Sequence, residues 1–86
     1  MTAQEQFIAA AGNTVVPSVL ALEAAGFQVE QIGEDLLRAA SPTGRYVAAD
    51  PLELLGLIKL IEVRGWSWQA TDSQIDSVLE RFGWTG

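Results

Sequence analysis

The sequence predicts an α+β domain with two N-terminal helices, a small three-stranded antiparallel sheet (one strand plus a hairpin), and two C-terminal helices packed on one face of the sheet. Three observations support this order. Capping residues bracket apolar segments at both ends of the chain, the middle alternates apolar and polar residues, and no repeat or linker interrupts it. Residues 1–86 are therefore expected to form a single compact domain, as is usual for a chain of 86 residues.

Two helices are expected before the sheet. The first is predicted at residues 3–11, with Thr2 as its N-cap and Gly12 at its end. The second is predicted at about residues 16–25, where Gly26 supplies the positive-φ position that ends a helix at low cost. The alanines of the first helix favour helical backbone but bury little surface, so this helix is expected to be the least firmly held.

Three short segments in the middle of the chain are expected to form the sheet. Residues 27–32 alternate with a period of two, which is typical of a half-buried strand. Residues 36–40 and 45–49 flank the sequence Ser-Pro-Thr-Gly, which suits a type I turn or a longer loop between two hairpin strands. Residues 36–40 also have helical propensity, but the segment that follows the turn needs a neighbouring strand, and this one is nearest.

The clearest boundary lies at the start of the next helix. Asp50 is suited to the N-cap, Pro51 to the first helical position and Glu53 to the third, an arrangement that resembles a capping box. The helix is expected to extend to Arg64 and to end at Gly65.

The last helix is expected to follow Thr71 as its N-cap, with Gln74 at N3, and to end at Gly83. Trp84 is placed to close a Schellman-type contact with Leu79. Four apolar residues at i, i+3, i+4 and i+7 form an amphipathic stripe, and they are Ile75, Val78, Leu79 and Phe82.

The helix at residues 52–64 is apolar on nearly all of its sides. One face is the expected core stripe, made of Leu54, Leu57, Ile58 and Ile61. Other apolar residues lie on the remaining sides, and they are Leu52, Leu55, Leu60 and Val63. Either the sheet and the terminal helices enclose this helix, or another subunit or partner covers its second face. Gly56 marks a position where another element could approach closely.

Three tryptophans lie beyond residue 65, at positions 66, 68 and 84. Trp66 and Trp68 could anchor the connection between the last two helices, with Trp84 packed at the end of the last helix. Alternatively, the alternation in Trp66-Ser67-Trp68 leaves one indole exposed beside Arg64 as a protein-binding hot spot. The candidate interface predicted from the sequence therefore comprises Leu52, Leu55, Lys59, Leu60, Val63, Trp66 and Trp68.

The composition excludes several kinds of active site. The chain has no cysteine and no histidine, which excludes Ser-His-Asp and Cys-His catalysis, haem ligation, disulfides and the usual zinc sites. Asp72, Asp76 and Glu80 share one helix face, and a solvated face is favoured there over acid–base chemistry or a cation site. We therefore assign no catalytic, cofactor-binding or metal-binding residue. We expect a protein that is not an enzyme, with no cofactor and no evident small-molecule substrate.

The charge and the targeting signals also limit the function. The formal net charge of −6 argues against nucleic-acid binding, which requires clustered Lys and Arg. The first residues lack the positive charge of a signal peptide, and the longest apolar segment, residues 51–63, is too short to span a membrane. We therefore expect a cytoplasmic protein with no membrane contact, and the lack of cysteine suits a reducing compartment.

Three classes of function remain. The favoured one is a small acidic protein-interaction module, such as an adaptor, an immunity-type inhibitor or an assembly protein, whose partner is another protein or a second copy in a homodimer. One alternative is an acidic mimic of nucleic acid that blocks a basic cleft, which the five acids and absent bases of residues 1–37 allow. The other is an enzyme or enzyme subunit that uses carboxylate chemistry. The two-faced helix and the tryptophans favour the first class.

Overall fold

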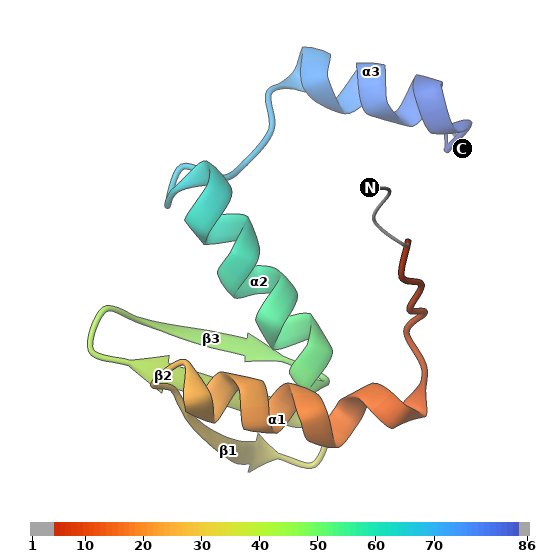
Figure 1. The fold of residues 1–86 in the computed structure, drawn as a ribbon. Helices are drawn as coiled ribbons and strands as arrows, with labels where there is room; N and C mark the ends of the chain where they lie inside the picture. Colours follow the sequence, from red (N-terminus) through yellow and green to blue (C-terminus); the bar gives the residue numbers. More distant parts are fainter. Residues whose placement is uncertain (1–4, 85–86) are drawn as a thin grey trace, which may run out of the picture.

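The computed structural model describes residues 5–84, and within them it contains one 3₁₀ turn, three α-helices and three strands (Figure 1). In chain order these elements are η1 (Gly12–Thr14), α1 (Val15–Ala24), β1 (Gln28–Gly33), β2 (Leu36–Ser41), β3 (Gly44–Ala48), α2 (Pro51–Arg64) and α3 (Asp72–Phe82). The order confirms the α+β class, with one N-terminal helix, an antiparallel sheet and two C-terminal helices.

The first predicted helix, at residues 3–11, is wrong over the part that the structure describes. Residues 5–10 have no regular secondary structure, and Thr2, the expected N-cap, lies outside the described residues. Phe7 is 92% exposed and Ile8 is 86% exposed. A helix this short is marginal in water unless tertiary packing stabilises it, and the propensity of alanine does not replace that packing. The described chain therefore has one α-helix before the sheet instead of two.

The second predicted helix is confirmed as α1, which begins and ends one residue earlier than expected. Its end is a Schellman motif, in which the Phe27 N–H donates to the Leu22 carbonyl and the Gly26 N–H donates to the Glu23 carbonyl, both at 3.0 Å. Gly26 has a φ of 95°, which L side chains rarely adopt. The glycine therefore sets the point where the chain leaves α1 and enters β1.

The predicted sheet is confirmed, with antiparallel strands in the order β1-β2-β3. The register aligns Val29, Ala39 and Tyr46 across the three strands, on the face where Ala39 is buried by the helices. The next row is on the opposite face, where Arg38 forms an ion pair with Glu30. One face of the sheet therefore packs on helices and the other is open to solvent, as antiparallel sheets allow.

The predicted start of α2 is also confirmed. The Asp50 carboxylate accepts a hydrogen bond of 2.8 Å from the Glu53 N–H, and Pro51 is the first helical residue. The Glu53 carboxylate reaches back one residue further than a capping box requires and accepts from the Ala49 N–H at 3.0 Å. The helix ends at Gly65, which has a φ of 77°.

Replacing Asp50 with alanine is expected to lower the free energy of unfolding by about 1 kcal/mol, because the Glu53 N–H loses its acceptor. Urea denaturation followed by far-UV circular dichroism measures the loss. Asp50→Ser is the matched control, since serine also caps helices and should retain most of the stability. An alanine variant as stable as the wild type would contradict this role of Asp50.

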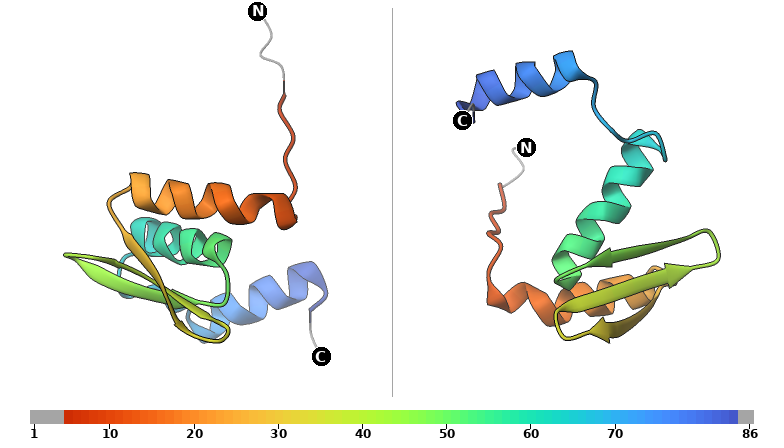
Figure 2. Two further views of the ribbon diagram at one scale, coloured as in Figure 1. Left: turned by 90° about the horizontal axis from the view of Figure 1, so that it is seen from below. Right: turned by 180° about the vertical axis from the view of Figure 1, so that it is seen from behind.

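The core is small and lies where α1 and α2 cover the same face of the sheet (Figures 1 and 2). Its buried apolar residues are Leu22 from α1, Ala39 from β2, Ala48 from β3 and Leu54 from α2. A ring of half-buried side chains packs around them, comprising Phe27, Val29, Leu37, Tyr46, Leu55, Leu57 and Ile58. Two leucines are thus the only large side chains that the described chain buries completely.

The position of α3 differs from the prediction that both C-terminal helices pack on the sheet. Only α2 does so, whereas α3 lies beyond the C-terminal end of α2 and away from the sheet, as Figure 1 and the right view of Figure 2 show. The linker of residues 65–71 is fixed at the end of α2 by the Arg64 side chain, which donates to the Trp68 carbonyl at 2.8 Å and to the Gln69 carbonyl at 3.5 Å. The linker therefore leads α3 away from the core.

The predicted ends of α3 are confirmed. Thr71 and Gln74 form a reciprocal capping box, with hydrogen bonds of 3.2 Å and 2.9 Å between side chains and backbone N–H groups. Gly83 is left-handed, and the Trp84 N–H donates to the Leu79 carbonyl at 2.8 Å, as in a Schellman motif. The helix is thus well defined locally, although it packs on no part of the sheet.

Candidate functional site

Helix α2 has two faces with different surroundings. The predicted core face is confirmed, since Leu54 is fully buried and Leu57, Ile58 and Ile61 are half-buried. At 3.6 residues per turn, a second set of residues lies on the opposite side. We call this set the outer face of α2, and it comprises Leu52, Gly56, Lys59 and Val63.

The outer face of α2 is exposed in the described chain. Val63 is 71% exposed, and Leu52 and Lys59 are also exposed. The close approach expected at Gly56 is not made within residues 5–84, because a Cβ atom there would meet nothing within 4 Å. The sheet and α1 therefore cover only one side of α2, and the described terminal segments do not enclose the other.

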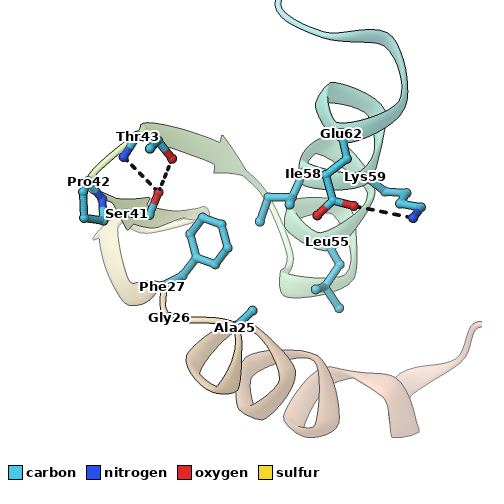
Figure 3. Close-up of a pocket in the computed structure, with 10 residues that line it drawn as sticks. All are labelled: Ala25, Gly26, Phe27, Ser41, Pro42, Thr43, Leu55, Ile58, Lys59 and Glu62. Carbon is cyan, nitrogen blue, oxygen red and sulfur yellow. Dashed lines mark hydrogen bonds and ion pairs between the residues drawn. The ribbon is translucent and has the colours of Figure 1, made fainter.

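The other predicted interface residues of α2 flank the outer face. Leu55 and Leu60 are half-buried and line separate clefts on its two sides. The cleft beside Leu55 has a volume of about 530 Å³ and lies between the end of α1, the β2–β3 turn and α2 (Figure 3). The groove beside Leu60 has a volume of about 450 Å³ and runs between β3 and α2.

The polar groups around the 530 Å³ cleft already pair with each other. Lys59 and Glu62 form an ion pair of 3.5 Å along α2, and the Ser41 and Thr43 hydroxyls lie 3.1 Å apart at the turn (Figure 3). Apolar side chains face the space between them, including Phe27 from the sheet side. This arrangement suits apolar contact more than acid–base chemistry.

Both predicted linker tryptophans are exposed, at 63% for Trp66 and 42% for Trp68. Trp66 also stacks on Tyr46, with ring centroids 5.9 Å apart and an interplanar angle of 21°. Its ring lies over Gly44, where a Cβ atom would approach within 3.1 Å. Trp66 therefore anchors the linker to the hairpin with one face of its ring and exposes the remainder to solvent, and both indoles rather than one are exposed.

A further exposed apolar surface belongs to α3, which was expected to pack on the sheet. The apolar stripe of α3 has Ile75 and Phe82 exposed and Val78 and Leu79 half-buried. A groove of about 420 Å³ runs along this stripe between Arg64 and Trp84. The amphipathic period of α3 was visible in the sequence, but it gives no information on which surface the stripe contacts.

Asp72, Asp76 and Glu80 do not form a metal-binding group, and no three acidic side chains gather for that purpose within residues 5–84. In the same part of the chain, no helix has the length and the apolar character needed to cross a membrane.

Comparison of the chain with protein-family models, with curated proteins and with solved structures finds no match.

Proposed function

We propose that the protein is a small interaction module that binds another protein, or a second copy of itself, through the outer face of α2 and the adjoining tryptophans of the linker. The observation that carries this proposal is the exposure of three large apolar side chains close together in the sequence, Val63 at the end of α2 and Trp66 and Trp68 in the linker that follows. Monomeric proteins rarely leave large contiguous apolar patches exposed, and tryptophan is enriched among binding hot spots.

Burying these exposed side chains at an interface would release enough free energy for a specific contact. The exposed part of Trp66 has an area on the order of 150 Å², and removing it from water gives about 4 kcal/mol at 25 cal/mol per Å². Burying Trp68 and Val63 together with it would offset much of the entropic cost of association, which is about 4 to 15 kcal/mol. Because the tryptophan ring is already held by Tyr46, little further side-chain entropy is lost on binding.

The charge and composition of the chain agree with this role. A net charge of −6 favours a protein partner over a nucleic acid. The absence of histidine and cysteine favours a binding role over an enzymatic one. We include a cytoplasmic location in the proposal, because a chain without cysteine suits a reducing compartment.

Affinity capture tests the proposal, with the full chain as bait in a lysate of the source organism. We expect a partner, or a second tagged copy of the chain, to be retained by the wild type and reduced at least about tenfold by Val63→Asp or Trp68→Ala. Leu20→Asp on α1 is the matched control, since Leu20 is equally accessible but lies on another helix.

Circular dichroism checks that each bait is folded. The proposal would be contradicted if Val63→Asp and Trp68→Ala baits retained the same proteins as the wild type. It would also be contradicted if the wild type retained neither a second protein nor a second copy.

A further inference from the structure

The chain exposes far more surface than a closed monomer of its size. Its solvent-accessible surface is 7135 Å², whereas compact monomers of 9.2 kDa expose about 5,000 Å². The radius of gyration is 16.0 Å, against about 12 Å for a compact chain of 86 residues. The extended segment before η1 and the separate position of α3 both contribute to this open shape (Figures 1 and 2).

Two surfaces of the open chain carry exposed apolar side chains and do not meet. One is the stripe of α3, in which Ile75 and Phe82 are exposed. The other is the outer face of α2, where Leu52 and Val63 are exposed and the open position at Gly56 would let another helix approach closely. An amphipathic helix of 11 residues with one apolar stripe requires a partner surface to be stable, since isolated helices of this length are marginal in water.

The linker keeps these two surfaces apart within one chain. The hydrogen bonds from Arg64 to the carbonyls of Trp68 and Gln69 hold the linker extended past the end of α2. Trp66 is anchored on Tyr46 at the start of the same linker. For α3 to fold back on its own α2, these contacts would have to break, whereas a second copy can meet α3 without breaking them.

We propose that two copies of this chain exchange their C-terminal helices, so that the apolar stripe of α3 from each copy packs on the outer face of α2 of the other. This inference rests on the proposed function and names its partner. The exchange forms two identical contacts related by a twofold axis, which is the usual symmetry of homodimers. It covers the stripe of α3 and the outer face of α2 together.

The exposed area is the right size for such a dimer. The surface exceeds that of a compact monomer by about 2,000 Å². A standard interface buries about 800 Å² per partner, which is less than half of this excess.

Light scattering coupled to gel filtration, performed on the full chain at micromolar concentration, tests the exchange. The wild type is expected to have twice the mass of the 9.2 kDa chain. Val63→Asp on α2 and Ile75→Asp on α3 are each expected to raise the dimer dissociation constant by about 100-fold or more, because each buries an unpaired carboxylate. Ser77→Asp, on the exposed polar side of α3, is the matched control and should remain dimeric.

A mixture of the two dissociated variants distinguishes exchange from other dimers. The Val63→Asp chain retains a normal α3, and the Ile75→Asp chain retains a normal α2, so one of the two contacts forms in the mixed pair. We expect an equimolar mixture to recover mass equal to two chains at concentrations where each variant alone is monomeric. A dimer formed by two α2 helices face to face would instead tolerate Ile75→Asp, since this residue lies on α3, and that result would overturn the exchange.

Several outcomes would overturn the exchange. The first is a wild type with the mass of one chain, including one in which α3 folds back on its own α2. The second is a dimer that tolerates both aspartate variants. The third is an equimolar mixture of the two variants that remains monomeric. A monomeric wild type that still captures another protein through Val63 would overturn this inference and leave the proposed function standing. If the chain formed no dimer and captured no protein, both would fail.

Discussion

Replacing Leu54 with alanine is expected to lower the free energy of unfolding by about 3 to 5 kcal/mol. Leu54 is fully buried in α2 and packs in the core with Leu22 of α1 and with Ala39 of the sheet. Removing its side chain loses the transfer free energy of the buried carbons and leaves a cavity. Small domains have a total stability of only about 5 to 15 kcal/mol, so this single change removes a large part of it.

Urea denaturation at a fixed protein concentration measures the loss for Leu54→Ala. Leu22→Ala, the equivalent truncation on α1, should produce a similar loss because Leu22 is also fully buried. Val63→Ala on the outer face of α2 is the matched control, and at a concentration where the chain is monomeric it should change stability by less than about 0.5 kcal/mol. A loss below about 1 kcal/mol for Leu54→Ala would show that α2 is rotated differently on the sheet.

Replacing Tyr46 with alanine is expected to lower the free energy of unfolding by about 2 to 4 kcal/mol. The Tyr46 ring joins two other aromatic rings, with an edge-to-face contact to Phe27 at 5.9 Å and a stacked contact to Trp66 at 5.9 Å. Without it, the sheet loses a packing residue of the core and the linker loses its anchor on the hairpin. Tryptophan emission should therefore shift to longer wavelength in the folded protein, as Trp66 becomes more exposed.

Tyr46→Phe is the control, because it keeps the ring and removes only the hydroxyl. We expect it to retain the emission maximum of the wild type and to lose less than about 1 kcal/mol. Trp66→Phe assigns the spectral change, since Tyr46→Ala should produce no further shift in that background. Equal losses of stability in the alanine and phenylalanine variants would show that the ring stacking is not what holds the linker.

The elements bounded by local signals were predictable to within one or two residues. Asp50 accepts from the Glu53 N–H, and Thr71 and Gln74 cap each other, as their spacing indicated. The hairpin around Ser41 and Gly44 forms in the expected place. Each of these features depends on groups a few residues apart, so the sequence contains all the partners.

Two parts of the fold were not predictable in the same way. The helix expected at residues 3–11 has good propensity but is not formed over the described residues, because no surface stabilises it there. Helix α3 forms as expected but does not pack on the sheet, because the linker is fixed at the C-terminal end of α2 by Arg64 and on the hairpin by Trp66, and α3 starts beyond these contacts. Both errors came from assuming that an apolar helix finds its partner in the nearest core.

The candidate site was predicted in part. The apolar residues on the outer face of α2 and the linker tryptophans were identified from their positions, and the structure finds most of them exposed. The anchoring of Trp66 on Tyr46 was not predictable, because it joins residues from separate elements across the fold. The exposure of the α3 stripe was missed for the same reason.

Local sequence signals were sufficient to predict the class of fold, the ends of the capped helices and the hairpin. The composition was sufficient to exclude active sites that depend on histidine or cysteine. Tertiary packing alone decided which side of α2 is covered, where α3 lies, and which indole is anchored. The physical reason is that caps and turns are satisfied within a few residues of the chain. An apolar stripe has the same period whether it contacts its own sheet, a distant segment or a second copy of the protein.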